Sequence, residues 1–268
     1  MADEGPASGP KRTRIALVVP TKDKMRHLAK TLPDNARLGF DEVIVVDSST
    51  RERQEVEDLC RAAGVRYHFA PLDRLGARNK GVELSAADWV CVLDDDILLT
   101  RFDLGLFRRT AQGLDFMIGG WGGNTESQYA WIFRRDFFLD TLHGYDPDIT
   151  GGDDLDITLR AQELGRGKMA LDLGLYDSKA LGLAIAEEYP ERWIRNKVLY
   201  ALTFYPLLRR HPFLITRFLL SDGWRAKRLL KGESPARLLF ESFMERSGLV
   251  YGPVYHLLRK ARRQKRNG

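Results

Sequence analysis

The chain has 268 residues, of which 44% are hydrophobic and 29% are charged, so its composition is that of a globular protein. This length fits one large domain, or one domain with an extension. The net charge of +5 is modest, and two cysteines, Cys60 and Cys91, are too few for a disulfide framework, which favours a reducing, cytoplasmic setting.

The two ends of the chain differ from its middle. Residues 1–12 are polar with glycine and proline, so we expect a disordered lead-in and no signal peptide. Beyond about residue 186 the pattern is helical, and residues 259–266 hold six basic residues and no acidic one. The most apolar stretch there, residues 198–220, is interrupted by Arg209, Arg210, His211 and Arg217, so we expect no transmembrane helix.

Strands and helices are predicted to alternate in the first part of the chain. Apolar, β-favouring runs predict strands at residues 14–20, 42–47, 65–69 and 90–93. The segments between them predict helices at residues 26–32, 51–63 and 75–86. Strands and helices alternating at this spacing are typical of a parallel, doubly wound α/β sheet.

Three adjacent carboxylates follow the strand predicted at residues 90–93. Asp94, Asp95 and Asp96 repel one another and cannot all be charged in a dry core. Ligands of open α/β sheets gather at the carboxyl ends of the strands. We therefore expect positive charge to meet the triplet there, with an oxygen-preferring divalent cation as the leading candidate and a solvated acidic turn as the alternative.

A dinucleotide-binding domain is one way to interpret this pattern, with Asp47 holding a ribose. Such a domain needs a glycine-rich phosphate turn after its first strand, where this chain has Pro-Thr-Lys-Asp-Lys at residues 20–24. Without those glycines the backbone cannot approach a pyrophosphate closely, which argues against this interpretation.

Six motifs, in order and at matching spacing, resemble those of the family-2 glycosyltransferases with the GT-A fold. They occupy residues 20–24, 43–47, 76–81, 93–96, 144–146 and 151–156, followed by Arg160 and Gly165, so that the resemblance covers residues 14–168. It implies a doubly wound, mostly parallel, Rossmann-like sheet in a GT-A domain at residues 13–186. The nucleotide-binding half would span 13–115 and the acceptor half 116–186, with a basic helical extension at 187–268.

The resemblance also implies which residues bind the donor. Pro20, Thr21, Asp23 and Asp47 match the positions that hold the nucleotide base, and Arg78 and Asn79 match a pair near the diphosphate and sugar. Asp94 and Asp96 match the metal-binding aspartates, and Asp95, with Asp94, would also contact the donor's ribose or sugar. Mg²⁺ or Mn²⁺ fits such an all-oxygen site, and zinc does not, because no His or Cys cluster is present.

Some of these positions have simpler interpretations. The family often has Asn where Asp23 stands, and a carboxylate can accept a hydrogen bond from a base but cannot donate one. The alternative for Asp47 is a turn or helix-cap role, and the alternative for Arg78 and Asn79 is an exposed helix face. Arg78 is nevertheless well suited to phosphate, because its planar fork makes two parallel charge-assisted bonds.

The acceptor side centres on a helix predicted at residues 153–164. Asp153, Asp154 and Asp156 crowd its first turn, where the helix dipole favours negative charge, but capping alone explains one aspartate better than three. By the resemblance Asp154 is the catalytic base, and Asp153 stands where Glu is commoner. In the glycine-rich segment 119–124, Trp121 is expected either to stack on a sugar or lipid acceptor or to lie in the core.

The resemblance therefore implies an inverting, metal-dependent hexosyltransferase. Asp154 would take the proton of an acceptor hydroxyl, which attacks the anomeric carbon of a nucleotide-activated sugar while the diphosphate leaves from the opposite face. We favour a UDP-sugar donor, with GDP- and dTDP-sugars as alternatives. The competing functions are a non-catalytic sugar-nucleotide binding protein and a nucleotidyltransferase, although the latter needs a glycine-rich loop after the first strand that this chain lacks.

The basic, aromatic-rich extension points to the location of the acceptor. Such helices lie in membrane interfaces and are attracted to anionic lipid, which favours a lipid-linked or membrane-proximal glycan as acceptor, for example in the cell envelope. The alternative is that the helices only pack on the sheet. The enzyme would be either free in the cytoplasm or peripheral at the inner face of the cell membrane. No nucleic-acid-binding module is recognisable, and the oligomeric state stays open.

Overall fold

The computed structural model describes residues 12–118, 130–149, 153–170, 173–181, 209–210 and 212. The chain divides into two compact units, residues 1–144 with 161–182, and residues 145–160 with 183–268. The predictions for the lead-in at residues 1–11, for Trp121 and for nearly all of the extension fall outside the described residues. Among the described residues, no helix combines the length and the apolar character that a membrane span requires.

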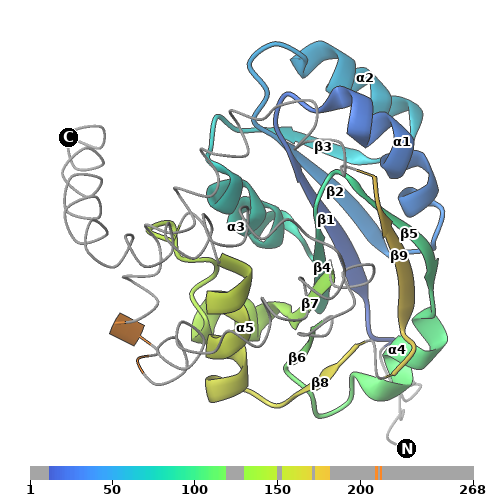
Figure 1. Ribbon diagram of the computed structural model, residues 1–268. Coiled ribbons are helices and arrows are strands. Elements are labelled where there is room, and N and C mark those ends of the chain that lie inside the picture. The colour runs from blue at the N-terminus through green and yellow to red at the C-terminus, as the bar shows by residue number, and fades with distance from the viewer. Residues whose placement is uncertain are drawn as a thin grey trace, which may run out of the picture. The chain divides into compact units, whose positions relative to one another are not determined.

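A seven-stranded sheet in the order β3-β2-β1-β4-β7-β6-β8 forms the centre of the first unit (Figure 1). β1 lies parallel to β2 and β4, and β2 lies parallel to β3, while β7 runs antiparallel to β4 and β6. This confirms the predicted mostly parallel α/β fold. The bounds of the strands are β1 Ile15–Thr21, β2 Glu42–Asp47, β3 Arg66–Phe69, β4 Trp89–Leu93, β6 Phe116–Ile118, β7 Ala130–Arg134 and β8 Gly167–Met169.

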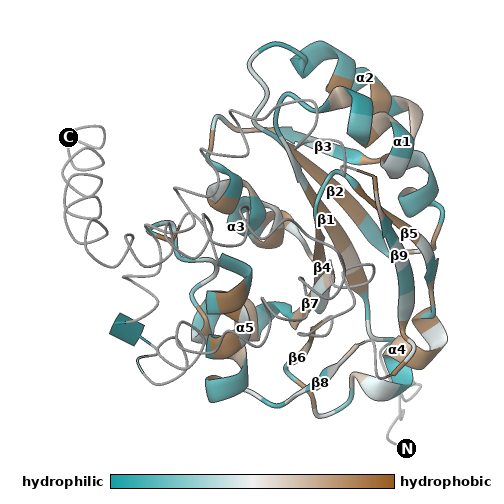
Figure 2. Cartoon of the chain, in the orientation of Figure 1, coloured by the Kyte–Doolittle hydropathy of each residue, from teal (hydrophilic) through white to brown (hydrophobic). Residues whose placement is uncertain are grey.

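Helices cover both faces of this sheet, as a doubly wound fold requires. α1 (Met25–Ala36) and α2 (Arg53–Ala62) lie on one side of the strands and α3 (Arg74–Leu84) on the other (Figure 1). Figure 2 shows hydrophobic residues along β1 and β2, the strands that these helices flank. The central strands are apolar throughout because both of their faces are buried.

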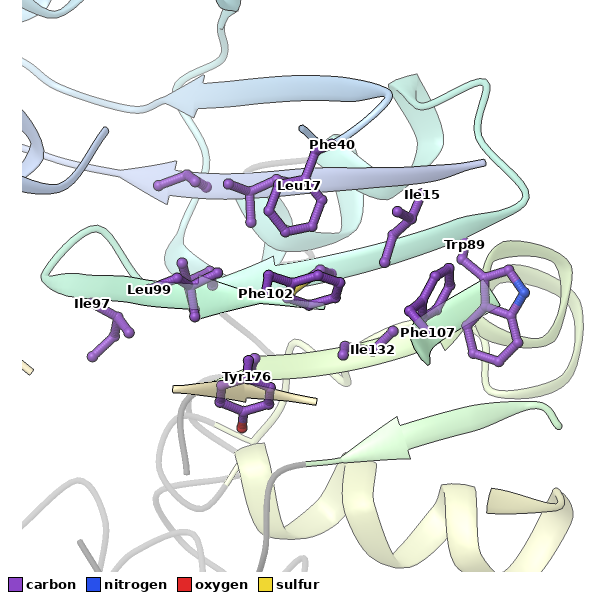
Figure 3. Close-up of a cluster of buried hydrophobic side chains, with 14 of the residues drawn as sticks. Ile15, Leu17, Phe40, Trp89, Ile97, Leu99, Phe102, Phe107, Ile132 and Tyr176 are labelled. Carbon is purple, nitrogen blue, oxygen red and sulfur yellow. The ribbon is translucent and has the colours of Figure 1, made fainter. Parts of the chain in front are cut away.

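The larger core lies on the α1–α2 face and includes a second, two-stranded sheet (Figure 3). That sheet pairs β5 (Ile97–Phe102) with β9 (Tyr176–Ala180), and α4 (Leu104–Thr110) follows β5. Aromatic rings fill this core: Phe102 lies 4.8 Å from Phe40 and Phe107 lies 5.5 Å from Trp89, measured between centroids. β5 and β9 thereby fix the backbone that directly follows the aspartate triplet.

On the opposite face, α3 approaches the sheet closely at Gly81. A Cβ atom on this glycine would lie 2.2 Å from a methyl carbon of Val18 and 3.2 Å from one of Val46. Any larger residue would therefore push α3 away from β1 and β2. Because α3 also carries Arg78 and Asn79, this contact sets the height of those side chains above the sheet.

Two features differ from the elements that the sequence predicts. α1 does not end at Leu32 but continues through Pro33 to Ala36, because the side chain of Asn35 holds the last turn by hydrogen bonds to the backbone of Ile97 and Leu99. The π-helix η1 (Phe137–Thr141) and the elements β5, α4, β6, β8 and β9 were not predicted. α5 (Asp153–Leu164) has the predicted bounds, and its residues up to Arg160 belong to the second unit.

Candidate active site

Asp95, the middle residue of the triplet, is bound by the loop that follows β1. Its carboxylate accepts hydrogen bonds from the Thr21 hydroxyl and the Lys24 ammonium, both at 2.9 Å. Only 4% of Asp95 is exposed, and its carbonyl accepts a further bond from the Thr31 hydroxyl at 2.8 Å. This aspartate therefore joins the end of β4 to the β1–α1 loop.

Asp94 forms an ion pair with Arg78 of α3. Nη2 of Arg78 lies 2.6 Å from Oδ1 of Asp94, and the arginine side chain is fully buried while 27% of the aspartate side chain is exposed. The guanidinium also lies 5.4 Å from the ring centroid of Trp131. Burial alone would raise the pKa of Asp94, but the charges of Arg78 and Arg74 outweigh it and lower that pKa to about 2.

The carboxylate of Asp96 is half-buried and accepts no hydrogen bond within the described parts of the chain. Its carbonyl oxygen is used structurally, because it accepts a bond from the amide of Leu181 at 2.8 Å. The expected meeting of the triplet with positive charge is thus confirmed for two of its members. The chain supplies that charge through Lys24 and Arg78.

The titration of the Lys24–Asp95 pair reflects this crowding. Burial would lower the pKa of Lys24, but the carboxylates of the triplet outweigh it, so that pKa is raised and the ammonium stays charged. Burial raises the pKa of Asp95, and together with the neighbouring Asp94 and Asp96 it outweighs the opposing effect of Lys24. The pKa of Asp95 is therefore raised although its carboxylate lies 2.9 Å from the Lys24 ammonium.

The carboxylates of Asp94 and Asp96 offer oxygen ligands for a divalent ion. Among the described residues, no three His, Cys, Asp or Glu side chains are grouped so that they could hold a metal by themselves. Mg²⁺ is usually bound through one or two carboxylates together with substrate phosphates and water. The donor set at Asp94 and Asp96 fits that mode, and the metal remains a prediction.

Asp23 and Asp47, predicted to contact the nucleotide base, join the loops after β1 and β2. Asp47 is fully buried, and its two oxygens accept bonds from the Ser49 amide at 2.8 Å and the Tyr67 hydroxyl at 3.0 Å. Asp23 has a positive φ of 49° and accepts bonds from the amides of Thr50 and Arg51. The turn role that the sequence left open for Asp47 is thus present, and base contact through either residue stays a prediction.

Asn79, the other donor-side residue of α3, lies against Gly144. A Cβ atom on that glycine would come within 2.7 Å of the Asn79 side-chain oxygen, and the glycine has a φ of 71°. Two of the motifs found in the sequence are therefore in contact. Gly144 is small because Asn79 occupies the space beside it.

The aspartates of α5 belong to the second unit and have different environments. Asp153 and Asp156 are buried, whereas Asp154 is half-buried. Asp156 accepts bonds at 2.8 Å from Arg160, one turn later, and from Arg210 of the extension. Of the three, Asp154 is the least buried, while Asp156 forms ion pairs with two arginines.

Sequence reasoning missed Lys24 and Arg210 as site residues. Lys24 lies in the motif at residues 20–24, directly after β1. Because β1 neighbours β4 in the sheet, its place after that strand was the available signal. Arg210 is separated from Asp156 by 54 residues, and no local pattern distinguishes it from the other basic residues of the extension. Gly151 and Gly152 of the motif at residues 151–156 lie outside the described residues.

The fold and this site define a glycosyltransferase domain of the GT-A type. Residues 16–150 match the family model described as Glycosyl transferase family 2, which spans half of the chain, and the chain belongs to this family. No curated protein sequence matches the chain significantly.

Several solved structures share the fold at low sequence identity. The mannosyltransferase PcManGT from Pyrobaculum calidifontis, in complex with GDP-Man and Mn²⁺, is 17% identical with a TM-score of 0.61, over 93% of this chain and 88% of that one. S. aureus TarS 1-349 is 14% identical with a TM-score of 0.51, over 94% and 92%. The glucosyl-3-phosphoglycerate synthase of Mycobacterium tuberculosis is 16% identical with a TM-score of 0.51, over 74% and 80%.

A longer TarS chain shows how far the likeness extends. The match covers 72% of this chain but only 40% of the TarS chain, with 16% identity and a TM-score of 0.51. The family match supports glycosyl transfer as the activity, and the shared fold agrees with it.

Proposed function

We propose that the protein transfers a hexose from a nucleotide-sugar to an acceptor hydroxyl with inversion at the anomeric carbon. The observation that carries this proposal is the charge arrangement at the end of β4, where Lys24 and Arg78 compensate Asp95 and Asp94 and leave Asp96 available. A UDP-sugar is the favoured donor. GDP- and dTDP-sugars are the alternatives, and solved structures of the same fold are complexes with UDP or with GDP-Man and Mn²⁺.

On the donor side, the loops after β1 and β2 would receive the base, and α3 would receive the diphosphate. Asp94 and Asp96 would hold Mg²⁺ or Mn²⁺, which when bound neutralises charge on the departing nucleoside diphosphate. Lys24 would keep Asp95 in place, so that its carboxylate reaches the ribose or sugar without repelling its neighbours. Arg78 has the same effect on Asp94, because the ion pair fixes one oxygen and leaves the other for a ligand.

On the acceptor side, Asp154 would accept the proton of the attacking hydroxyl as general base. Its half-buried position and the resemblance of residues 151–156 to the family's acidic motif support this role. Asp153 and Trp121 would line the acceptor. A lipid-linked or membrane-proximal glycan remains the proposed acceptor class, with the enzyme in the cytoplasm or peripheral at the inner membrane face.

The donor and metal parts of this proposal can be tested with a thermal-shift panel. UDP-, GDP- and dTDP-sugars are added to the whole protein with and without Mn²⁺, because a ligand that binds only the folded state raises the melting temperature. We expect one nucleotide class to raise it, and to do so more strongly with Mn²⁺. No shift with any nucleotide-sugar would contradict the proposed donor class.

The catalytic assignment is tested by Asp154→Asn, with Glu163→Gln as the matched control on the exposed part of α5. Loss of a general base lowers transfer by about 10²–10⁴-fold, so we expect that loss with donor affinity unchanged. The control should transfer sugar at the wild-type rate. Full transfer by the Asp154 variant would refute the base assignment, and donor binding without transfer by the wild type would instead support the non-catalytic alternative.

A further inference from the structure

Two features of the sequence have no role in the proposed reaction: Asp146 of the Gly-Tyr-Asp motif, and the basic residues of the extension. In the second unit they meet, because Arg210 pairs with both Asp146 and Asp156. Nη1 of Arg210 lies 2.8 Å from Oδ1 of Asp156, and Nη2 contacts Oδ2 of Asp146. One guanidinium thus bridges the loop before α5 and the first turns of α5.

We infer that Arg210 is a positioning residue that fixes the first turn of α5, and with it Asp154, against the loop at residues 145–149. This inference rests on the proposed function for its catalytic consequence. Arg210 needs no contact with substrate for this role. It acts through the two carboxylates that it holds together.

Burial makes this bridge consequential. Asp156 is only 1% exposed, and it lies between the guanidinium groups of Arg160 and Arg210. Arg160 comes from the same helix, four residues later, so its bond cannot fix the helix relative to anything else. Arg210 reaches this carboxylate from another part of the chain, and removing one partner of a buried charge is costly.

Asp146 is held on its other side as well. Its Oδ1 accepts a bond from the Asp148 amide at 2.7 Å, so the carboxylate that meets Arg210 belongs to a closed turn. That amide and Arg210 outweigh the effect of burial and lower the pKa of Asp146, so the carboxylate is ionised at neutral pH. One side chain therefore joins this hydrogen-bonded turn to the first turns of α5.

The helix end that is held in this way carries Asp154. Asp154 lies two residues before Asp156 in the first turn, and its carbonyl accepts a 2.6 Å bond from the Thr158 hydroxyl. The backbone of Asp154 is thus fixed to the same turns that Arg210 anchors. An error of about 1 Å in the position of a catalytic group can lower the rate about 100-fold, so loosening this anchor should affect the chemical step.

The guanidinium is suited to this role in a way that an ammonium is not. Its planar fork directs two N–H groups to two different carboxylates, whereas lysine is a point charge on a flexible stem. Arg210→Lys keeps the charge, so it should keep the fold but restore only part of the anchoring. Arg209→Met is the matched control, because it removes the same charge from the adjacent exposed residue.

The experiment compares Arg210→Met, Arg210→Lys and Arg209→Met in the whole protein by steady-state transfer kinetics and by hydrogen exchange of residues 153–159. For Arg210→Met we expect kcat to fall about 10–100-fold, the KM for the donor to change less than about twofold, and the amides of α5's first turns to exchange faster. Arg210→Lys should be intermediate, and Arg209→Met should match the wild type. A double variant that combines Arg210→Met with Asp146→Asn should lose no more kcat than Arg210→Met alone, because both substitutions remove the same ion pair.

Several outcomes would overturn the inference. They are unchanged kcat in Arg210→Met, an equal loss in Arg209→Met, or a loss of kcat without faster exchange in α5. If Arg210→Met does not fold, Arg210→Lys decides, and wild-type kcat in that variant counts against the role. If the wild type transfers no sugar from any donor, the proposed function fails, while faster α5 exchange in the variants still supports the anchor and unchanged exchange overturns it.

Discussion

The ion pair between Asp94 and the buried Arg78 should contribute measurably to stability. Asp94→Asn keeps the size of the side chain and an oxygen that can accept a bond, but removes the charge. A pKa of about 2, compared with the ordinary 3.8, corresponds to about 2.5 kcal/mol in favour of the ionised folded state. We therefore expect the variant to lose about 2.5 kcal/mol of unfolding free energy at pH 7.

The sign of the pH dependence follows from the lowered pKa. The contribution of Asp94 is fully present above the unfolded-state pKa of 3.8 and is lost as the pH falls through about 2. The difference between wild type and variant should therefore be constant from pH 7 to pH 5. At pH 3 roughly half of it should remain, because the unfolded state is by then mostly protonated at this position.

Urea unfolding followed by circular dichroism at pH 7, 5 and 3 measures this difference. Asp34→Asn is the control, because it removes a carboxylate whose pair with Arg37 is mostly exposed, and such pairs contribute less than about 1 kcal/mol. A loss at pH 7 that is no larger than the control's would refute the reasoning. So would a loss that does not shrink at pH 3, because the charge of Asp94 would then not be its cause.

Three further predictions concern the packing and the loops of the first unit and its metal ligands. Gly81→Ala should destabilise the protein by about 1–3 kcal/mol in urea unfolding, because its Cβ atom would lie 2.2 Å from a methyl carbon of β1. The control is Gly105→Ala, whose Cβ atom would make no contact under 3.4 Å and which should be near neutral. Tyr67→Phe removes a hydrogen bond from the buried carboxylate of Asp47 and should cost about 1–3 kcal/mol, and an unperturbed melting temperature would count against that bond. Asp96→Asn should weaken Mn²⁺ binding at least about tenfold in the presence of nucleotide, measured by electron paramagnetic resonance, and equal binding would remove Asp96 from the metal site.

The elements that the sequence predicted well are those whose signals are local. β1, β2 and β4 are continuous apolar runs because both faces of a central parallel strand are buried, so their sequences show their position directly. The acidic triplet was equally informative, because the cost of crowding carboxylates at a strand end does not depend on distant residues. The need for positive charge near Asp94 and Asp95 followed from that cost alone.

The elements that were missed depend on partners far away in the chain. β5 is a strand because it pairs with β9, whose Ala180 lies opposite Ile97, and a register shift between Leu99 and Arg101 interrupts the alternation of β5. The last turn of α1 forms despite Pro33 because Asn35 finds two backbone partners beside β5. Tertiary bonds of this kind outweigh local propensity, and a single sequence does not display them.

The identity of the compensating charges shows the same limit within the candidate site. From the sequence, three carboxylates after β4 required cations without indicating whether the chain or a ligand provides them. In the structure, Lys24 from the loop after β1 pairs with Asp95, and Arg78 of α3 pairs with Asp94. Because two of the three charges are then compensated internally, the requirement for an external cation reduces to the carboxylate of Asp96 and the second oxygen of Asp94. Such a site has little excess negative charge of its own, so any divalent ion that it binds should depend on the additional oxygens of a diphosphate, as the proposed reaction requires.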